Sequence, residues 1–139
     1  MGTRSTTHFR EKDGITEAIV YQHWDGYPEG AGTDILKFLM EIKQNVRDTR
    51  FFDASYLAAR YVVFLGNKFR DENKNLLDFT SVGICLKDPG DIAYRYVVEC
   101  GNLTERGLPN VICWKLGYPG LKEVKCETIP EPEDWEDPV

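Results

Sequence analysis

The chain has 139 residues, of which 42% are hydrophobic and 29% charged, as in an ordinary globular domain large enough to bury a core. Its formal net charge is −6, but six acidic residues lie in residues 127–139 and the remainder is neutral, which argues against binding to duplex nucleic acid. The longest apolar run, Tyr61–Leu65, is far too short to cross a bilayer, and the polar start lacks the apolar core of a secretory signal. We therefore expect no membrane partner.

Two β-strands are predicted at the start of the chain, over residues 3–10 and 15–24. They flank Asp13-Gly14, a dipeptide typical of tight hairpin turns. With these two residues at the centre of the turn, Arg10 lies opposite Glu17, and this pair of opposite charges supports the register.

The same register gives the hairpin two faces and places Arg4 opposite His23. The predicted core face carries Phe9, Ala18, Val20 and Trp24. The opposite face carries Arg4, Thr6, His8, Ile19, Tyr21 and His23.

Two helices are predicted after the hairpin. The Gly- and Pro-containing residues 25–32 end the strand, and apolar residues at helical spacing predict a first helix over 33–47. A second helix is predicted from Asp53 or Ser55 to Gly66, which is a typical residue just beyond a helix C-terminus. Its last turn is rich in residues that favour strands, so a strand is the alternative there.

The second half of the chain alternates apolar and polar residues as β-strands do. Strands are predicted over 80–86, 92–100 and 111–116, with a weaker one over 122–129. A charged loop is expected over 71–74 and an Asp-Pro-Gly-Asp turn over 88–91. The pattern predicts an α+β fold with an N-terminal β-hairpin, two helices and an antiparallel β-meander, forming one sheet with helices packed on one face.

One domain is expected over residues 1–126. Residues 127–139 form an acidic, Pro-containing tail, which we expect to be extended and partly disordered. The four cysteines, at positions 85, 100, 113 and 126, include no close pair of the kind that zinc sites use. Since no secretory signal supports disulfides, we expect them to act as small apolar side chains.

The run from Tyr21 to Pro28, together with Arg4, gathers chemically versatile side chains. Arg4 offers a planar fork of donors for anionic oxygens, and His23 donates or exchanges a proton near neutral pH. Tyr21 and Tyr27 offer rings for stacking, while Asp25 orients the turn or the histidine. We predict an anionic, nucleotide-like small molecule as the ligand of Arg4, Tyr21, His23, Asp25 and Tyr27. The alternative is a purely structural corner in which Trp24 anchors the core and Asp, Gly and Pro form the turn.

Enzymatic function has less support in the sequence. It contains no nucleophile-elbow, zinc-peptidase or P-loop motif, so no catalytic residue is assigned. His8, His23 and Asp25 are too dispersed for a metal site, and we expect neither a metal nor another cofactor. A small hydrolase or nuclease-like enzyme that uses His23 and Asp25 is an alternative.

A protein-interaction module is the third interpretation. Tyr94 and Tyr96, with Arg95 between them, are residues of the kind that anchor interfaces, and they would form an aromatic sheet face. The competing interpretation is that both rings pack beneath the helices, since they alternate with Ile92 and Val98.

The start Gly2-Thr3-Arg4-Ser5 and the run from His23 to Pro28 resemble a group of small phage, prophage and mobile-element proteins that begin with MGTRS and carry HWDGYP. Residues 53–59 are similar to the second helix of that group. The resemblance implies no catalytic residues, because the group has no established activity. It implies a non-catalytic accessory protein in the cytoplasm of a host cell, which engages a host protein or sequesters a nucleotide-like small molecule.

Overall fold

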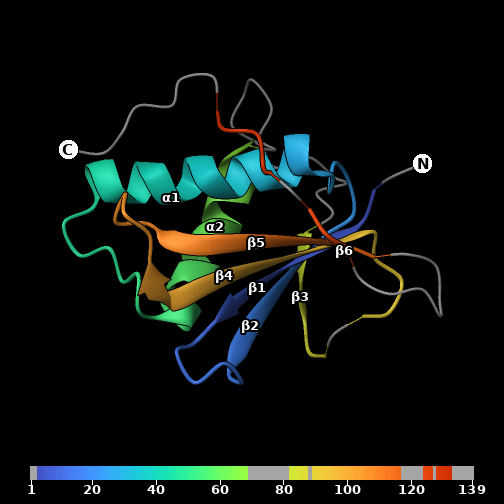
Figure 1. Ribbon diagram of the computed structural model, residues 1–139, viewed down its shortest axis with the longest axis horizontal. Coiled ribbons are helices and arrows are strands. Elements are labelled where there is room, and N and C mark those ends of the chain that lie inside the picture. The colour runs from blue at the N-terminus through green and yellow to red at the C-terminus, as the bar shows by residue number, and fades with distance from the viewer. Residues whose placement is uncertain (1–2, 69–81, 88, 117–123, 127, 133–139) are drawn as a thin grey trace.

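The computed structural model describes residues 3–68, 82–87, 89–116, 124–126 and 128–132. Six strands and two α-helices make up this part of the chain, in the order β1 (Ser5–Arg10), β2 (Glu17–Gln22), α1 (Thr33–Asn45), α2 (Ala54–Lys68), β3 (Val82–Cys85), β4 (Tyr94–Leu103), β5 (Pro109–Lys115) and β6 (Val124–Lys125). A single π-helical turn, Pro28–Gly32, leads directly into α1. The α+β class and the single sheet are confirmed, and Figure 1 shows α1 running along the strands with α2 behind it.

The sheet is mixed, with the strand order β3-β2-β1-β4-β5-β6. Neighbours are antiparallel except β1 and β4, which pair in parallel. The expected meander is therefore wrong for β3, which pairs with β2, and right only for β4, β5 and β6. The physical reason lies in β1: the side chains from Thr6 to Phe9 are at most 1% exposed, so both edges and both faces of this strand must be covered.

The hairpin register is as predicted. Arg10 pairs with Glu17 and Thr6 with Tyr21, and Arg10 Nε donates to a Glu17 carboxylate oxygen at 3.0 Å. The Asp13 carboxylate accepts hydrogen bonds from the next backbone amides and closes the loop, while Gly14 adopts a φ of 74°. Local chemistry at the turn thus sets the register of two strands.

The helices follow the apolar spacing of the sequence. In α1 the buried residues include Ile35, Leu39 and Ile42. The helix α2 continues through Gly66 to Lys68, so the end expected at Gly66 is wrong. The alternative strand is also wrong, because Leu57, Tyr61 and Leu65 are all buried and their four-residue spacing places them on one side of a helix.

An aromatic cluster joins both helices to one face of the sheet. The ring of Tyr61 lies 5.6 Å from that of Phe9 and 5.2 Å from that of Phe38, centroid to centroid. The Tyr61 hydroxyl donates to Gln22 Oε1 at 2.9 Å, although both side chains are buried. Trp24 was expected to face this core, but it is 43% exposed because the chain turns away from the sheet after Gln22.

The described part of the acidic tail packs against the domain. Thr33 Oγ1 donates to the Pro130 carbonyl at 2.7 Å, Arg106 pairs with Glu131 at 2.8 Å, and Ile129 contacts the core. Residues 127 and 133–139, the charged loop expected over 71–74 and Asp88 of the predicted turn lie outside the described residues. Among the residues described, none of the helices combines the length and apolar character needed to span a membrane.

Replacing Tyr61 with Phe should cost about 1–3 kcal/mol of unfolding free energy, because it leaves the buried amide oxygen of Gln22 without its donor. The matched control is Tyr56→Phe on the same helix, where the side chain is 48% exposed. Urea denaturation with an unchanged m-value measures the difference. Equal midpoints for the two variants would contradict this account of the core.

Candidate functional site

The chain turns sharply where β2 ends, and this corner carries the predicted site. Asp25 adopts a φ of 55°, in the left-handed region that a non-glycine residue seldom occupies. The amide of Gly26 donates to the Thr3 carbonyl at 2.9 Å, and the Gly26 carbonyl accepts from the Tyr96 hydroxyl at 2.7 Å. The corner is therefore fastened to the start of β1 and to the buried interior of β4.

His23 is held by the aromatic rings on either side of it in the sequence. The Tyr21 hydroxyl lies 2.8 Å from His23 Nδ1, and the Trp24 ring meets the imidazole edge-on at 4.6 Å between centroids. Burial raises the pKa of Tyr21, and Arg4 opposes this effect while Asp91 adds to it. The phenol hydroxyl and the ring nitrogen therefore share one hydrogen bond, whose donor depends on the histidine tautomer.

Arg4 does not pair with His23 as the hairpin register had predicted. The ladder between β1 and β2 ends at Ser5 and Gln22, and the Arg4 carbonyl accepts hydrogen bonds from β4 instead. The Arg4 guanidinium lies 2.7 Å from an Asp91 carboxylate oxygen. The positive charge of Arg4 nevertheless acts on the Tyr21 phenol, whose hydroxyl contacts His23 Nδ1.

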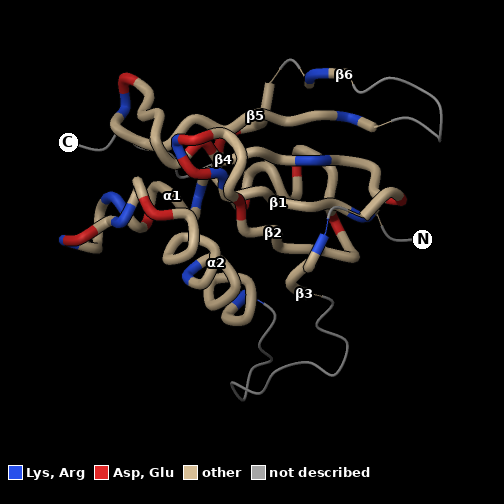
Figure 2. Tube along the Cα trace, turned by 90° about the horizontal axis from the view of Figure 1, so that it is seen from below, with Lys and Arg blue, Asp and Glu red and all other residues tan. Residues whose placement is uncertain are grey.

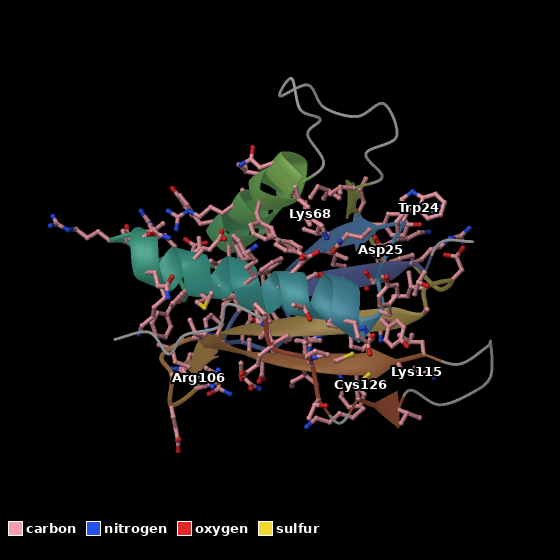
Figure 3. All side chains as sticks on the ribbon, turned by 90° about the horizontal axis from the view of Figure 1, so that it is seen from above. Trp24, Asp25, Lys68, Arg106, Lys115 and Cys126 are labelled. Carbon is pink, nitrogen blue, oxygen red and sulfur yellow. The ribbon has the colours of Figure 1, made fainter. Side chains whose placement is uncertain are left out.

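Asp25 and Tyr27 form a separate exposed pair at the tip of the corner. The Tyr27 hydroxyl donates to Asp25 Oδ1 at 3.3 Å, and the charge of Asp25 raises the pKa of Tyr27. Figure 3 shows Asp25 next to Trp24 at this end of the sheet. His23 and Asp25 are thus held by different tyrosines, and these two contacts do not join them as the acid–base pair of the hydrolase alternative.

A polar chain that the sequence did not reveal lies on the sheet face opposite the helices. Thr6 Oγ1 is 3.0 Å from His8 Nε2, and Glu17 bridges His8 Nδ1 and Arg10 Nε at 3.0 Å each. The order Thr–His–Glu is that of a nucleophilic triad. However, the Thr6 side chain is completely buried and His8 is 1% exposed, so this chain supports the sheet and does not offer a nucleophile to a substrate.

The expected aromatic sheet face of Tyr94 and Tyr96 is also corrected. Tyr96 is fully buried in the core, and Tyr94 stacks on it at 6.4 Å between ring centroids. By strand alternation and pairing, the opposite face carries Trp114, Arg95 and Tyr21 in one row across the sheet. Figure 2, which views the molecule from below, shows the strands side by side in the order of the sheet, from β6 to β3.

Two further observations bear on ligands. Within the described residues, no group of three or more His, Cys, Asp or Glu side chains is arranged to hold a metal ion. A cavity of about 560 Å³ lies between α1, β5 and residues 125, 126, 128, 129 and 131, and none of the five predicted site residues lines it. The predicted site therefore lies outside this cavity, with Arg4, Tyr21 and His23 half-buried and Asp25 and Tyr27 exposed.

Comparison with known proteins gives no further assignment. No family model, curated protein or solved structure matches the chain.

Substituting Gly26 with Ala should destabilise the fold by about 1–3 kcal/mol, because a β-carbon there would lie 2.7 Å from both the Ser5 β-carbon and the Thr3 carbonyl. Gly90→Ala is the control, since a β-carbon at Gly90 meets no atom within 4 Å. Thermal and urea unfolding should separate the two variants. A Gly26→Ala protein as stable as the control would show that the corner is not pinned here.

Glu17 should contribute to acid sensitivity. Its burial alone would raise its pKa, but the hydrogen bonds and charges of His8 and Arg10 outweigh burial and lower it. A lowered folded-state pKa means that the stabilisation is present above the ordinary glutamate value, about 4.3, and is lost as the pH falls through the folded value. Unfolding measured from pH 7 to pH 3 should therefore show a shallower acid loss for Glu17→Gln than for the exposed control Glu105→Gln.

Proposed function

We propose that this protein is a non-catalytic binding protein of the phage accessory type, which sequesters an anionic, nucleotide-like small molecule. The proposed site comprises Arg4, Tyr21 and His23 at the base and Asp25 and Tyr27 at the rim. The observation that carries the proposal is the contact of the Tyr21 hydroxyl with the His23 imidazole, which lies against the exposed Trp24 ring and near enough to Arg4 for its charge to act on Tyr21.

The ion pair between Arg4 and Asp91 indicates how an anion would enter. The two side chains are 43% and 75% exposed, and an exposed pair of this kind contributes only about 0–1 kcal/mol. A phosphate offers more acceptor oxygens and more negative charge than one carboxylate, and it binds the guanidinium fork in two places. We therefore expect a phosphate to displace Asp91 from Arg4.

The remaining groups suit the other parts of a nucleotide. In the tautomer in which the Tyr21 hydroxyl donates to Nδ1, the His23 ring carries its proton on Nε2 and can donate it to a second anionic oxygen. Trp24 and Tyr27 are 43% and 38% exposed and offer flat apolar surfaces of the kind on which bases stack. The rigid corner keeps these rings in place before binding, which reduces the entropy lost on association.

Arg4 and Asp91 provide a pair of variants with opposite expected effects. Arg4→Gln should weaken binding of adenosine monophosphate by roughly 10- to 100-fold, since hydrogen bonds to charged groups contribute about 1.5–3 kcal/mol. Asp91→Asn should strengthen it by about two- to fivefold, because the competing carboxylate charge is removed. Isothermal titration calorimetry measures both effects, and adenosine serves as the ligand without phosphate.

The same titration separates the alternatives. Adenosine and its monophosphate should differ in affinity for the wild-type chain and differ little for Arg4→Gln. Equal binding of both ligands by the wild-type chain, or a loss of binding in Asp91→Asn, would contradict the proposed site. Consumption of the nucleotide that is abolished by His23→Ala would favour the hydrolase alternative.

A further inference from the structure

Two cysteines face each other across the last two strands of the sheet. Trp114 pairs with Lys125 in the ladder between β5 and β6, so the next rung joins Cys113 and Cys126, and the Cys126 amide donates to the Cys113 carbonyl at 2.9 Å. Both thiols are free, and their sulfur atoms are 2.8 Å apart. In Figure 3 Cys126 lies at the β5–β6 edge of the sheet, close to Lys115.

The two thiols differ in their access to solvent. Cys113 is 3% exposed and packs beside Tyr96, and burial raises the pKa of its thiol far above the ordinary value. Cys126 is only partly buried. A reagent in solution therefore meets Cys126 first, while Cys113 is held directly behind it.

The other two cysteines cannot replace either partner. Cys100 is fully buried in the core, and Cys85 lies in β3 at the opposite edge of the sheet. In contrast, directly opposite residues of antiparallel strands have α-carbons about 4.5–5.5 Å apart, within the range of about 4.4–6.8 Å that disulfides span. Among the four cysteines, Cys113 and Cys126 are therefore the pair whose geometry allows a disulfide.

This pair stands where the C-terminal arm, residues 124–126 and 128–132, joins the domain. The arm adds the two-residue strand β6 to the sheet, and its described residues are also held by the Thr33–Pro130 hydrogen bond, the Arg106–Glu131 ion pair, the packing of Ile129 and the burial of Pro132. Both cysteines also line the cavity of about 560 Å³ that the arm covers. A covalent link at this point would hold the arm over the cavity.

We propose that Cys113 and Cys126 form a reversible disulfide, made by exchange with a low-molecular-weight disulfide such as oxidised glutathione, which fastens the C-terminal arm to β5. This inference is independent of the nucleotide site proposed above.

The exchange proceeds in two balanced steps. The Cys126 thiolate attacks one sulfur of oxidised glutathione, forms a mixed disulfide and releases one glutathione thiolate. The Cys113 thiol then attacks the Cys126 sulfur, and its proton passes to the second glutathione, which leaves as a thiol. The two protein thiols are oxidised, one glutathione disulfide is reduced to two glutathione thiols, and reduced glutathione in excess reverses the sequence.

The full chain is incubated with oxidised glutathione and compared with the reduced chain. We expect the number of titratable thiols to fall from four to two, the mass to fall by two hydrogen atoms, and peptide mapping to link Cys113 to Cys126. Trypsin cleavage after Lys125 should slow by about tenfold or more, because the crosslink removes much of the chain entropy that opening of the arm would gain. Cys85→Ser should behave as the wild-type chain does, and Cys126→Ser should lose both effects.

The wild-type reaction decides the proposal even if a variant folds poorly. A stable glutathione adduct at Cys126 without loss of the Cys113 thiol would overturn the exchange, as would a crosslink that involves Cys85 or Cys100. A Cys113–Cys126 disulfide with an unchanged rate of cleavage after Lys125 would overturn the fastening of the arm.

Discussion

The central position of β1 is the constraint on which the rest of the structure depends. This strand pairs with β2 on one edge and with β4 on the other, and its side chains from Thr6 to Phe9 have almost no contact with solvent. Phe9 supplies the core beneath the helices, whereas Thr6 and His8 point to the other face and need polar partners there. Thr6 contacts His8, and His8 contacts Glu17, which is itself paired with Arg10, so these two buried side chains find their partners within the sheet.

The candidate site is built from the same strand. Immediately before β1, Thr3 and Arg4 use their backbone carbonyls to fix the corner at Gly26 and the start of β4. The side chain of Arg4 then reaches Asp91, a residue 87 positions away. The unfavourable φ of Asp25 is stabilised by these surroundings, which is common where a rigid backbone presents side chains for binding. The backbone contacts that fix the corner at Gly26 therefore also place the exposed side chains of Asp25 and Tyr27 at its tip.

The two edges of the sheet are short and differ in what secures them. Among the described residues, β3 has four residues and pairs only with β2, while β6 has two residues and pairs only with β5. Short edge strands limit unwanted pairing with other chains, but they also bind weakly to their own sheet. At the β6 edge the thiols of Cys113 and Cys126 add a contact. Its strength depends on whether the two sulfur atoms are reduced or joined in the proposed disulfide, and not on the length of the strand.

The sequence by itself determined the features that depend on neighbours along the chain. Asp13-Gly14 and the Arg10–Glu17 pair defined the hairpin and its register, and apolar spacing defined both helices. Tertiary structure alone decided that β4 pairs in parallel with β1, that Arg4 meets Asp91 and that Cys113 faces Cys126. Polar residues such as Thr6 and His8 gave no sign of a central strand, because their burial is stabilised by partners on other segments. Which edges and termini meet depends on how the whole chain covers its apolar faces, and periodicity within one segment carries no such information.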